Sequence, residues 1–408
     1  MKTMRMTKTL VGSLAVFLAL GTLAESPTIS DVVVRQRWPW NRLVDIEYVL
    51  ACDAGQEVDI EVTAYDGATV LGLPLASLTG DLHCVSNGAR RIVWDPMKTG
   101  YTNAILPRFH VDLSPTNTPV YLIVDLTKNA GATNQIERIY PGDARLDTVG
   151  RWTNVWFGVT NGSVYKTEKV VLRRVPACTF KMGPYPPAYS ITLTKDFYAG
   201  VFEVTEAQWN KIMGDGSSVS DYPIANVSYD MIRGATNDVP SVNWYTTGSA
   251  VGATNFMGRI RTKTGIDTFD LPTEAQWECL CRAGTLSYWS DGVSTSATET
   301  NILNELGWWG GGYNGNSGNK THPVGRLAAN NWGLYDTHGN VWERCLDWYG
   351  SLASTTDPLG ALYSSSGRTI RGGSFDFTAA GAASGTRYGD TVNTSVSMKG
   401  FRLVMTLP

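Results

Sequence analysis

Six cysteines are the residues of this chain most able to carry redox or metal chemistry. They are Cys52, Cys84, Cys178, Cys279, Cys281 and Cys345. Cys279 and Cys281 form a C-x-C motif in a segment expected to be helical, where side chains at i and i+2 point apart and make a poor thiolate clamp. Cys52 and Cys84 share one expected domain, so a local disulfide is one pairing among several that the sequence leaves open. We expect buried or disulfide-bonded cysteines rather than a metal site.

The four histidines are His83, His110, His322 and His338. Their spacing places no two rings on one face of a helix, so they do not predict a facial iron site. His338 lies in a loop, and we interpret it as a loop contact rather than a ligand.

The first residues predict export. Lys2, Arg5 and Lys8 form a basic region, residues 10–23 are apolar, and small residues follow, which is typical of a signal peptide over 1–24. An uncleaved N-terminal anchor is the alternative, although the apolar run is short for a membrane span. After signal cleavage we expect no membrane span. The mature protein would be secreted, periplasmic or on the cell surface of a bacterium, where disulfides persist.

Composition limits the fold and the partners. A chain of 408 residues with 43% hydrophobic residues can build two or three domains. Only 17% of residues are charged, with 42 Gly and 14 Trp, which favours a loop-rich fold over a helical bundle. A net charge of −3 provides no basic surface for a phosphate backbone, so nucleic acid is not an expected partner.

An all-β domain is expected over 28–115. Apolar residues alternate at 58–64, 91–94 and 109–113, with turn residues between them, which predicts a sandwich of immunoglobulin type. Trp38 and Trp40 are interpreted as a packed aromatic cap on it rather than a binding site.

A linking segment over 116–168, with a strand or two, leads to the last domain at 169–408. Thr205 and Thr273 each begin a Thr-Glu-Ala-Gln-Trp sequence, a capping box that predicts a helix start. Short strands and Gly-rich loops make up the rest, so the chain is expected to be α+β.

Five segments carry a family resemblance. They are 197–209, 271–278 with 282–284, 333–343, 371–374 and 400–403. In this order and spacing they resemble the formylglycine-generating enzyme, or sulfatase-modifying factor, family. The resemblance covers 169–408 and implies a C-type-lectin-like fold, but fold alone does not establish activity.

The resemblance also locates the catalytic centre of that family. Its enzymes oxidise a cysteine with copper held by two cysteines, whose positions correspond here to Phe377 and Ala382. Neither side chain supplies the soft thiolate that Cu(I) requires. We therefore expect no copper and no catalytic residues. A second branch of the fold uses histidine-held iron, which the four histidines do not support.

The same resemblance implies one structural calcium ion. Its ligands would be Asp336, Gly339, Val341 and Glu343, through carboxylate and carbonyl oxygens of the kind that calcium prefers. The alternative is an ion-free turn whose carboxylates cap backbone amides.

The former substrate face implies a binding surface. Segment 375–396 lies between two family motifs and resembles the variable region of diversity-generating retroelement proteins; an ordinary loop rich in small polar residues is the alternative. The expected ligand-contacting residues are Trp342, Ser374, Phe375, Asp376, Phe377, Arg387, Tyr388 and Asp390. Aromatic and small residues of this kind form adaptable binding surfaces.

Three functions remain open at this point. The first is an exported, non-catalytic protein that binds or adheres to a protein or cell-surface ligand. The second is a divergent formylglycine-generating oxidoreductase acting on a protein cysteine. The third is a structural envelope protein.

Overall fold

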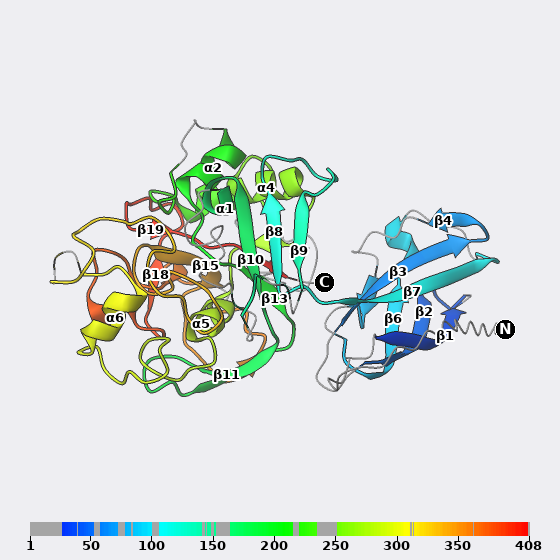
Figure 1. The fold of residues 1–408 in the computed structure, drawn as a ribbon. Helices are drawn as coiled ribbons and strands as arrows, with labels where there is room; N and C mark the ends of the chain where they lie inside the picture. The colour runs from blue at the N-terminus through cyan, green and yellow to red at the C-terminus, as the bar shows by residue number, and fades with distance from the viewer. Residues whose placement is uncertain are drawn as a thin grey trace, which may run out of the picture. The chain divides into compact units, whose positions relative to one another are not determined.

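The fold was determined as a computed structural model that describes residues 27–406 with internal gaps. The gaps are 39, 53–57, 72–77, 83–84, 100–105, 141–142, 144, 148–150, 152–163, 215–219, 235–250, 311, 313 and 362. The expected signal peptide, His83 and Cys84 therefore lie outside the described residues. The chain divides between Thr118 and Pro119 into two units, coloured along the chain in Figure 1.

The N-terminal unit consists of two antiparallel sheets. One contains, in spatial order, β1 (Thr28–Gln36), β2 (Val44–Ala51), β6 (Gly88–Trp94) and β5 (Leu78–Gly80). The other contains β4 (Thr69–Leu71), β3 (Val58–Asp66) and β7 (Phe109–Asn117), and a short helix, η2 (Pro96–Thr99), follows β6. Alternate residues of both sheets form one core, in which Trp94 stacks on Phe109 at 5.0 Å. The predicted all-β sandwich is confirmed.

The interpretation of Trp38 and Trp40 as a packed cap is wrong. Trp40 is 89% exposed, and Trp38 is also exposed, so neither ring covers the core. The indole side chain makes a packed position the usual outcome, but here the turn after β1 carries both rings to the surface.

A six-stranded antiparallel sheet runs through the C-terminal unit. Its spatial order is β14 (Phe269–Asp270), β20 (Val404–Thr406), β13 (Phe197–Gly200), β10 (Lys169–Val175), β8 (Tyr121–Asp125) and β9 (Ile136–Ile139). β8 and β9 come from the segment expected to be a linker. The unit therefore begins well before residue 169 and uses that segment as part of its main sheet.

Both faces of this sheet are buried. Tyr121 and Ile123 of β8 point into one core, while Leu122 and Val124 point into the other, as the two-residue period of a strand requires. The first core also contains residues of α5 (Glu274–Arg282). The second contains residues of α2 (Glu206–Met213), α3 (Tyr229–Arg233) and α4 (Phe256–Thr264). Helices therefore cover both faces, which explains the continuous apolar runs of the central strands.

Both expected capping boxes are present. Thr205 Oγ accepts a hydrogen bond from Gln208 N at 3.2 Å, and Gln208 Oε1 accepts from Thr205 N at 2.9 Å, at the start of α2. The same reciprocal pair joins Thr273 and Gln276 at the start of α5, at 3.1 and 2.9 Å. Each box satisfies two backbone amides that a helix start leaves unpaired.

Two smaller sheets and short helices complete the unit. One sheet has the order β18 (Arg387–Asp390), β17 (Arg368–Arg371), β15 (Trp342–Trp348) and β19 (Lys399–Gly400); the other has β11 (Cys178–Met182), β12 (Tyr189–Leu193) and β16 (Thr355–Thr356). The remaining helices are α1 (Val164–Thr167), α6 (Thr300–Leu306) and η3 (Ala379–Ala382). The α+β class is confirmed. No helix within the described ranges has the length and apolar character needed to cross a bilayer.

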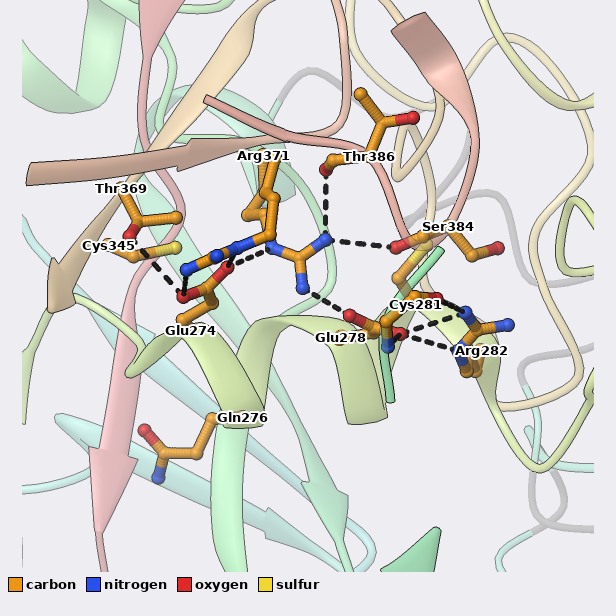
Figure 2. A network of polar contacts seen from close by, with 12 residues as sticks. Glu274, Gln276, Glu278, Cys281, Arg282, Cys345, Thr369, Arg371, Ser384 and Thr386 are labelled. Atoms are coloured by element: carbon orange, nitrogen blue, oxygen red, sulfur yellow. Dashed lines mark hydrogen bonds and ion pairs between the residues drawn. The ribbon is translucent and has the colours of Figure 1, made fainter. Parts of the chain in front are cut away.

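A buried ion-pair network fastens α5 to β17 (Figure 2). Arg371 of β17 pairs with Glu274 at 3.1 Å and also with Glu278. Arg371 Nη1 donates to the carbonyls of Ser384 and Thr386, at 3.2 and 2.9 Å. Arg282 pairs with the other oxygen of Glu278 at 2.8 Å. Because these side chains are removed from water, each charge depends on its partners.

Asp347 of β15 holds the start of α5. Its Oδ2 accepts a hydrogen bond of 2.6 Å from the backbone N of Glu274. Burial, with a smaller contribution from the negative charge of Glu274, raises the pKa of Asp347 to about 7 from an ordinary value of 3.8.

We predict that Asp347→Asn becomes more stable relative to the wild type as the pH rises. The folded state binds the Asp347 proton more tightly than the unfolded state. The resulting stability is complete below the unfolded pKa of 3.8 and is lost as the pH rises through about 7. Asparagine keeps the acceptor and does not titrate. The difference between their free energies of unfolding, obtained from thermal melts, should therefore grow by on the order of 2–4 kcal/mol between about pH 5 and pH 8.

Asp267→Asn, at an exposed position, is the matched control and should show no such divergence. A stability difference between Asp347→Asn and wild type that stays constant across this pH range would contradict the prediction.

Candidate functional site

A second buried ion pair lies beneath the candidate site, between Glu343 and Arg402. Arg402 Nη2 is 2.7 Å from Glu343 Oε1, and Arg402 Nε is 2.9 Å from Oε2. Trp277 Nε1 donates to Oε2 at 2.8 Å. Arg402 also donates to the carbonyls of Gly200 and Tyr335, both at 2.8 Å. Glu343 therefore joins β15, α5 and the segment before β20 through one carboxylate.

The turn before β15 is held by a further carboxylate, Glu203. Glu203 Oε2 accepts from Asn340 Nδ2 at 2.6 Å, and Oε1 accepts from the backbone N of Val341 at 3.2 Å. Asn340 itself has a φ of 57°, a left-handed conformation that asparagine tolerates. Burial raises the pKa of Glu203 well above its ordinary value, and the charges of Asp336 and Glu343 raise it further.

Asp336 makes one backbone contact. Its Oδ2 accepts from Gly325 N at 2.6 Å, whereas Oδ1 is buried and has no hydrogen-bond partner among the described residues. Burial raises the pKa of Asp336 to about 6. A proton on the Asp336 carboxyl would remove its buried negative charge, which a bound cation would instead compensate.

These contacts do not fit the expected calcium ion. Both oxygens of Glu343 are already engaged by Arg402 and Trp277. Across the described ranges, no three His, Cys, Asp or Glu side chains are grouped so that they could hold a metal. Gly339 has a φ of 83°, and a Cβ there would lie 2.0 Å from the Trp308 carbonyl oxygen, so backbone packing alone explains the glycine. Calcium bound by Asp336, Gly339, Val341 and Glu343 stays a prediction, and the geometry favours the ion-free turn.

The positions that correspond to the copper cysteines have different surroundings. Phe377 is half-buried at the surface, whereas Ala382 is buried in η3. The Ala382 carbonyl lies 2.7 Å from His338 Nδ1, and Ser290 N donates to His338 Nε2 at 3.1 Å. This pattern places the proton on Nδ1, and burial lowers the pKa of His338 to about 4, which keeps the ring neutral. His338 is a buried loop contact.

Three of the expected ligand-contacting residues form one aromatic cluster, which we call the aromatic triad. It consists of Trp342, Phe377 and Tyr388. Trp342 lies edge-to-face with Phe377 at 5.2 Å and with Tyr388 at 5.3 Å, and the last two rings are 5.6 Å apart. Trp342 is buried at the base, while Tyr388 is 46% exposed. Such edge-to-face contacts fix the ring orientations beyond simple area burial.

The other expected contact residues divide into inward and outward positions. Ser374 and Phe375 are buried, and the Ser374 hydroxyl has no described partner. Asp390 is buried and pairs with Arg344 at 2.7 Å and with Lys399. Asp376 is half-buried beside Gly312. The structure therefore brings Asp376 to the surface, while Ser374, Phe375 and Asp390 serve the interior.

Arg387 is also occupied by internal contacts. Its guanidinium pairs with Glu274 through two contacts of 2.5 and 2.6 Å and lies over the Tyr349 ring at 4.4 Å. Its role is therefore to extend the α5 network to β18.

Sequence reasoning missed the residues that position this site. Glu203, Trp277 and Arg402 are the most important of them. All three lie inside the segments that carried the family resemblance, and only the folded chain shows that they meet around Glu343 and its turn.

Comparisons with known proteins agree with this architecture. A family described as the sulfatase-modifying factor enzyme 1-like domain matches residues 158–407. Chaperone protein LppX of Paenibacillus barcinonensis is 28% identical over 47% of the chain and 75% of its own length. The formylglycine-generating enzyme of Thermomonospora curvata is 30% identical over 42% of the chain, which spans about half (52%) of that enzyme.

Solved structures show similar partial likeness. Treponema denticola variable protein 1 aligns over 58% of the chain and 95% of its own, with a TM-score of 0.44 and 27% identity. PvdO from Pseudomonas aeruginosa covers the same shares, with a TM-score of 0.44 and 20% identity.

The ion-free turn predicts that calcium does not stabilise the fold, because the Glu343 carboxylate already neutralises Arg402. EDTA or added calcium should leave the melting temperature unchanged. Glu343→Gln should cost about 3–5 kcal/mol with or without calcium, since it leaves the buried Arg402 charge unpaired. A melting temperature that rises with the logarithm of free calcium in the wild type, but not in Glu343→Gln, would instead establish the calcium site.

Proposed function

Because the chain belongs to the sulfatase-modifying factor enzyme 1-like domain family, we propose that it is an exported, non-catalytic member that binds a protein or cell-surface ligand through its aromatic triad. One observation carries this proposal. Where enzymes of the family would place copper thiolates, this chain has the half-exposed Phe377 ring against Trp342 and Tyr388, and the buried methyl group of Ala382. The surface remains while the reactive groups are replaced.

The buried thiols of Cys281 and Cys345 give no support to such chemistry. Cys281 Sγ lies 3.9 Å from Nε2 of His338, and Nδ1 of the same ring lies 2.7 Å from the Ala382 carbonyl. Burial raises the pKa of Cys281 to about 11 and that of Cys345 well above its ordinary value. A thiol held in this form is a poor nucleophile and a poor metal ligand. The divergent oxidoreductase therefore ranks second, supported by the 30% identity to the Thermomonospora enzyme.

The aromatic triad has the physical properties of a recognition surface. Aromatic rings offer large contact areas with few rotatable bonds, so ordering them on binding costs little entropy. The edge-to-face packing against the buried Trp342 holds the rings before a ligand arrives, which reduces the cost of association. Asp376 adds a negative group on the same segment, next to Phe377.

The strands beneath the triad are fixed by charge. Arg371 of β17 and Arg387 of β18 both pair with Glu274 of α5, and the first pairing is visible in Figure 2. Asp390 at the end of β18 pairs with Arg344 of β15. A rigid sheet that presents a few outward side chains supports recognition, and it would also tolerate the diversification of segment 375–396 at its outward positions.

We predict no formylglycine-generating activity. The purified full chain, incubated with copper and a peptide carrying the sulfatase modification motif, should leave the peptide mass unchanged, because Phe377 and Ala382 supply no thiolate. The Thermomonospora curvata enzyme is the positive control. Peptide conversion above a no-protein control would favour the divergent oxidoreductase.

We predict that Tyr388→Ala and Phe377→Ala each weaken binding by roughly tenfold or more, because both remove anchor area from the triad. The affinity of each variant is measured for the partner that the full wild-type chain retains in a pull-down from bacterial surface extracts. Melting temperatures are measured in parallel.

Tyr363→Ala is the matched control, since Tyr363 is a 72% exposed tyrosine outside the triad. Equal loss of binding in this control, or loss of binding only when Trp38 and Trp40 are replaced, would place the recognition surface elsewhere.

A further inference from the structure

Cys178 and Cys279 place their sulfur atoms side by side, although they are far apart in the chain. Cys178 is the first residue of β11, and Cys279 lies in the middle of α5. The two Sγ atoms are 2.8 Å apart. We propose that a disulfide joins Cys178 to Cys279 in the mature protein.

The surroundings make this pairing specific. Cys279 is buried in the first core of the C-terminal unit, and Cys178 packs against that core at its edge. Cys281, two residues further along α5, points to a different cluster with Trp277 and Cys345, and its Sγ contacts the Thr337 carbonyl. Side chains at i and i+2 of a helix diverge, so only Cys279 of the C-x-C pair faces β11.

The pKa values of the two thiols are shifted in opposite directions, which decides the order in which they react. The hydrogen bond from Cys279 lowers the pKa of the half-buried Cys178, whereas burial raises the pKa of Cys279. Cys178 is therefore the thiol that forms a thiolate and meets an external oxidant.

The reaction balances with a small-molecule or protein disulfide as oxidant. The Cys178 thiolate attacks one sulfur of that disulfide and releases the other as a thiolate, which leaves a mixed disulfide on Cys178. Cys279 loses its proton and attacks Cys178 Sγ, which releases the second thiolate. Two protein thiols are oxidised by two electrons, and the external disulfide is reduced to two thiols.

The bond would strengthen the element on which the polar network depends. It closes a loop of roughly 100 residues and ties β11 to α5, the helix that carries Glu274 and Glu278. It does not depend on ligand binding. The bond requires an oxidising compartment. It therefore rests on the export of the protein, which is one part of the proposed function.

Peptide mapping of the full chain tests the bond. The protein is equilibrated with oxidised and reduced glutathione, free thiols are alkylated, and tryptic peptides are analysed without reduction. Cys178 lies in peptide 175–181, whereas Cys279 and Cys281 share peptide 264–282, so variants must separate them. We expect the two peptides to be linked in the wild type and in Cys281→Ser, but not in Cys279→Ser.

Alkylated Cys178 and Cys279 in the oxidised wild type would overturn the proposal, and so would a link that survives Cys279→Ser. A second measurement uses Cys178→Ser and so does not depend on Cys279→Ser, whose substitution lies in the core. Dithiothreitol should lower the melting temperature of the wild type by roughly 5–15 °C and that of Cys178→Ser far less, because the latter has no bond to reduce. An equal effect of dithiothreitol on both proteins would also contradict the bond.

Discussion

The pairing of charges that have been taken out of water is the constraint on which the C-terminal unit depends. Arg371, Arg402, Glu278 and Glu343 are all fully buried, and each would be costly without its partner. The partners come from different segments: the glutamates of α5, Glu343 at β15, Arg371 at β17 and Arg402 before β20. The loops of this unit cannot move far without separating a pair. This explains how a unit with few helices and much irregular chain keeps a defined surface.

Much of the fold could be predicted from local chemistry. The capping boxes at Thr205 and Thr273 correctly predict where two helices begin. The alternation at 58–64 indicates which residues of β3 face the core. The resemblance carried by five segments led to the family, and the predicted sulfatase-modifying factor-like domain is confirmed. The sheet order could not be read this way, because β20 pairs with β13 and β14, which lie far earlier in the chain. Trp40 was predicted to be packed on the sandwich but is exposed, because hydrophobic character alone does not decide burial.

The site was less predictable than the fold. Trp342, Phe377 and Tyr388 were expected on one face, and the structure brings them together. Arg387 and Asp390 looked equally suited to recognition, yet their charges are satisfied by Glu274, Arg344 and Lys399. A charged residue in a sequence gives no sign of whether its partner is a ligand or another part of the same chain. That distinction depends on long-range contacts, which only the folded structure supplies.

Strand β20 has a consequence for truncated forms of this unit. β20 lies between β13 and β14 in the main sheet, and Arg402, just before it, neutralises Glu343. Neither the sheet nor this charge pair can be completed in a chain that stops short of residue 402. Such a chain lacks an interior strand of the main sheet and holds an uncompensated buried carboxylate, so it cannot reach the stable native state. Truncation before β20 therefore yields a substrate for proteases rather than a shortened working protein.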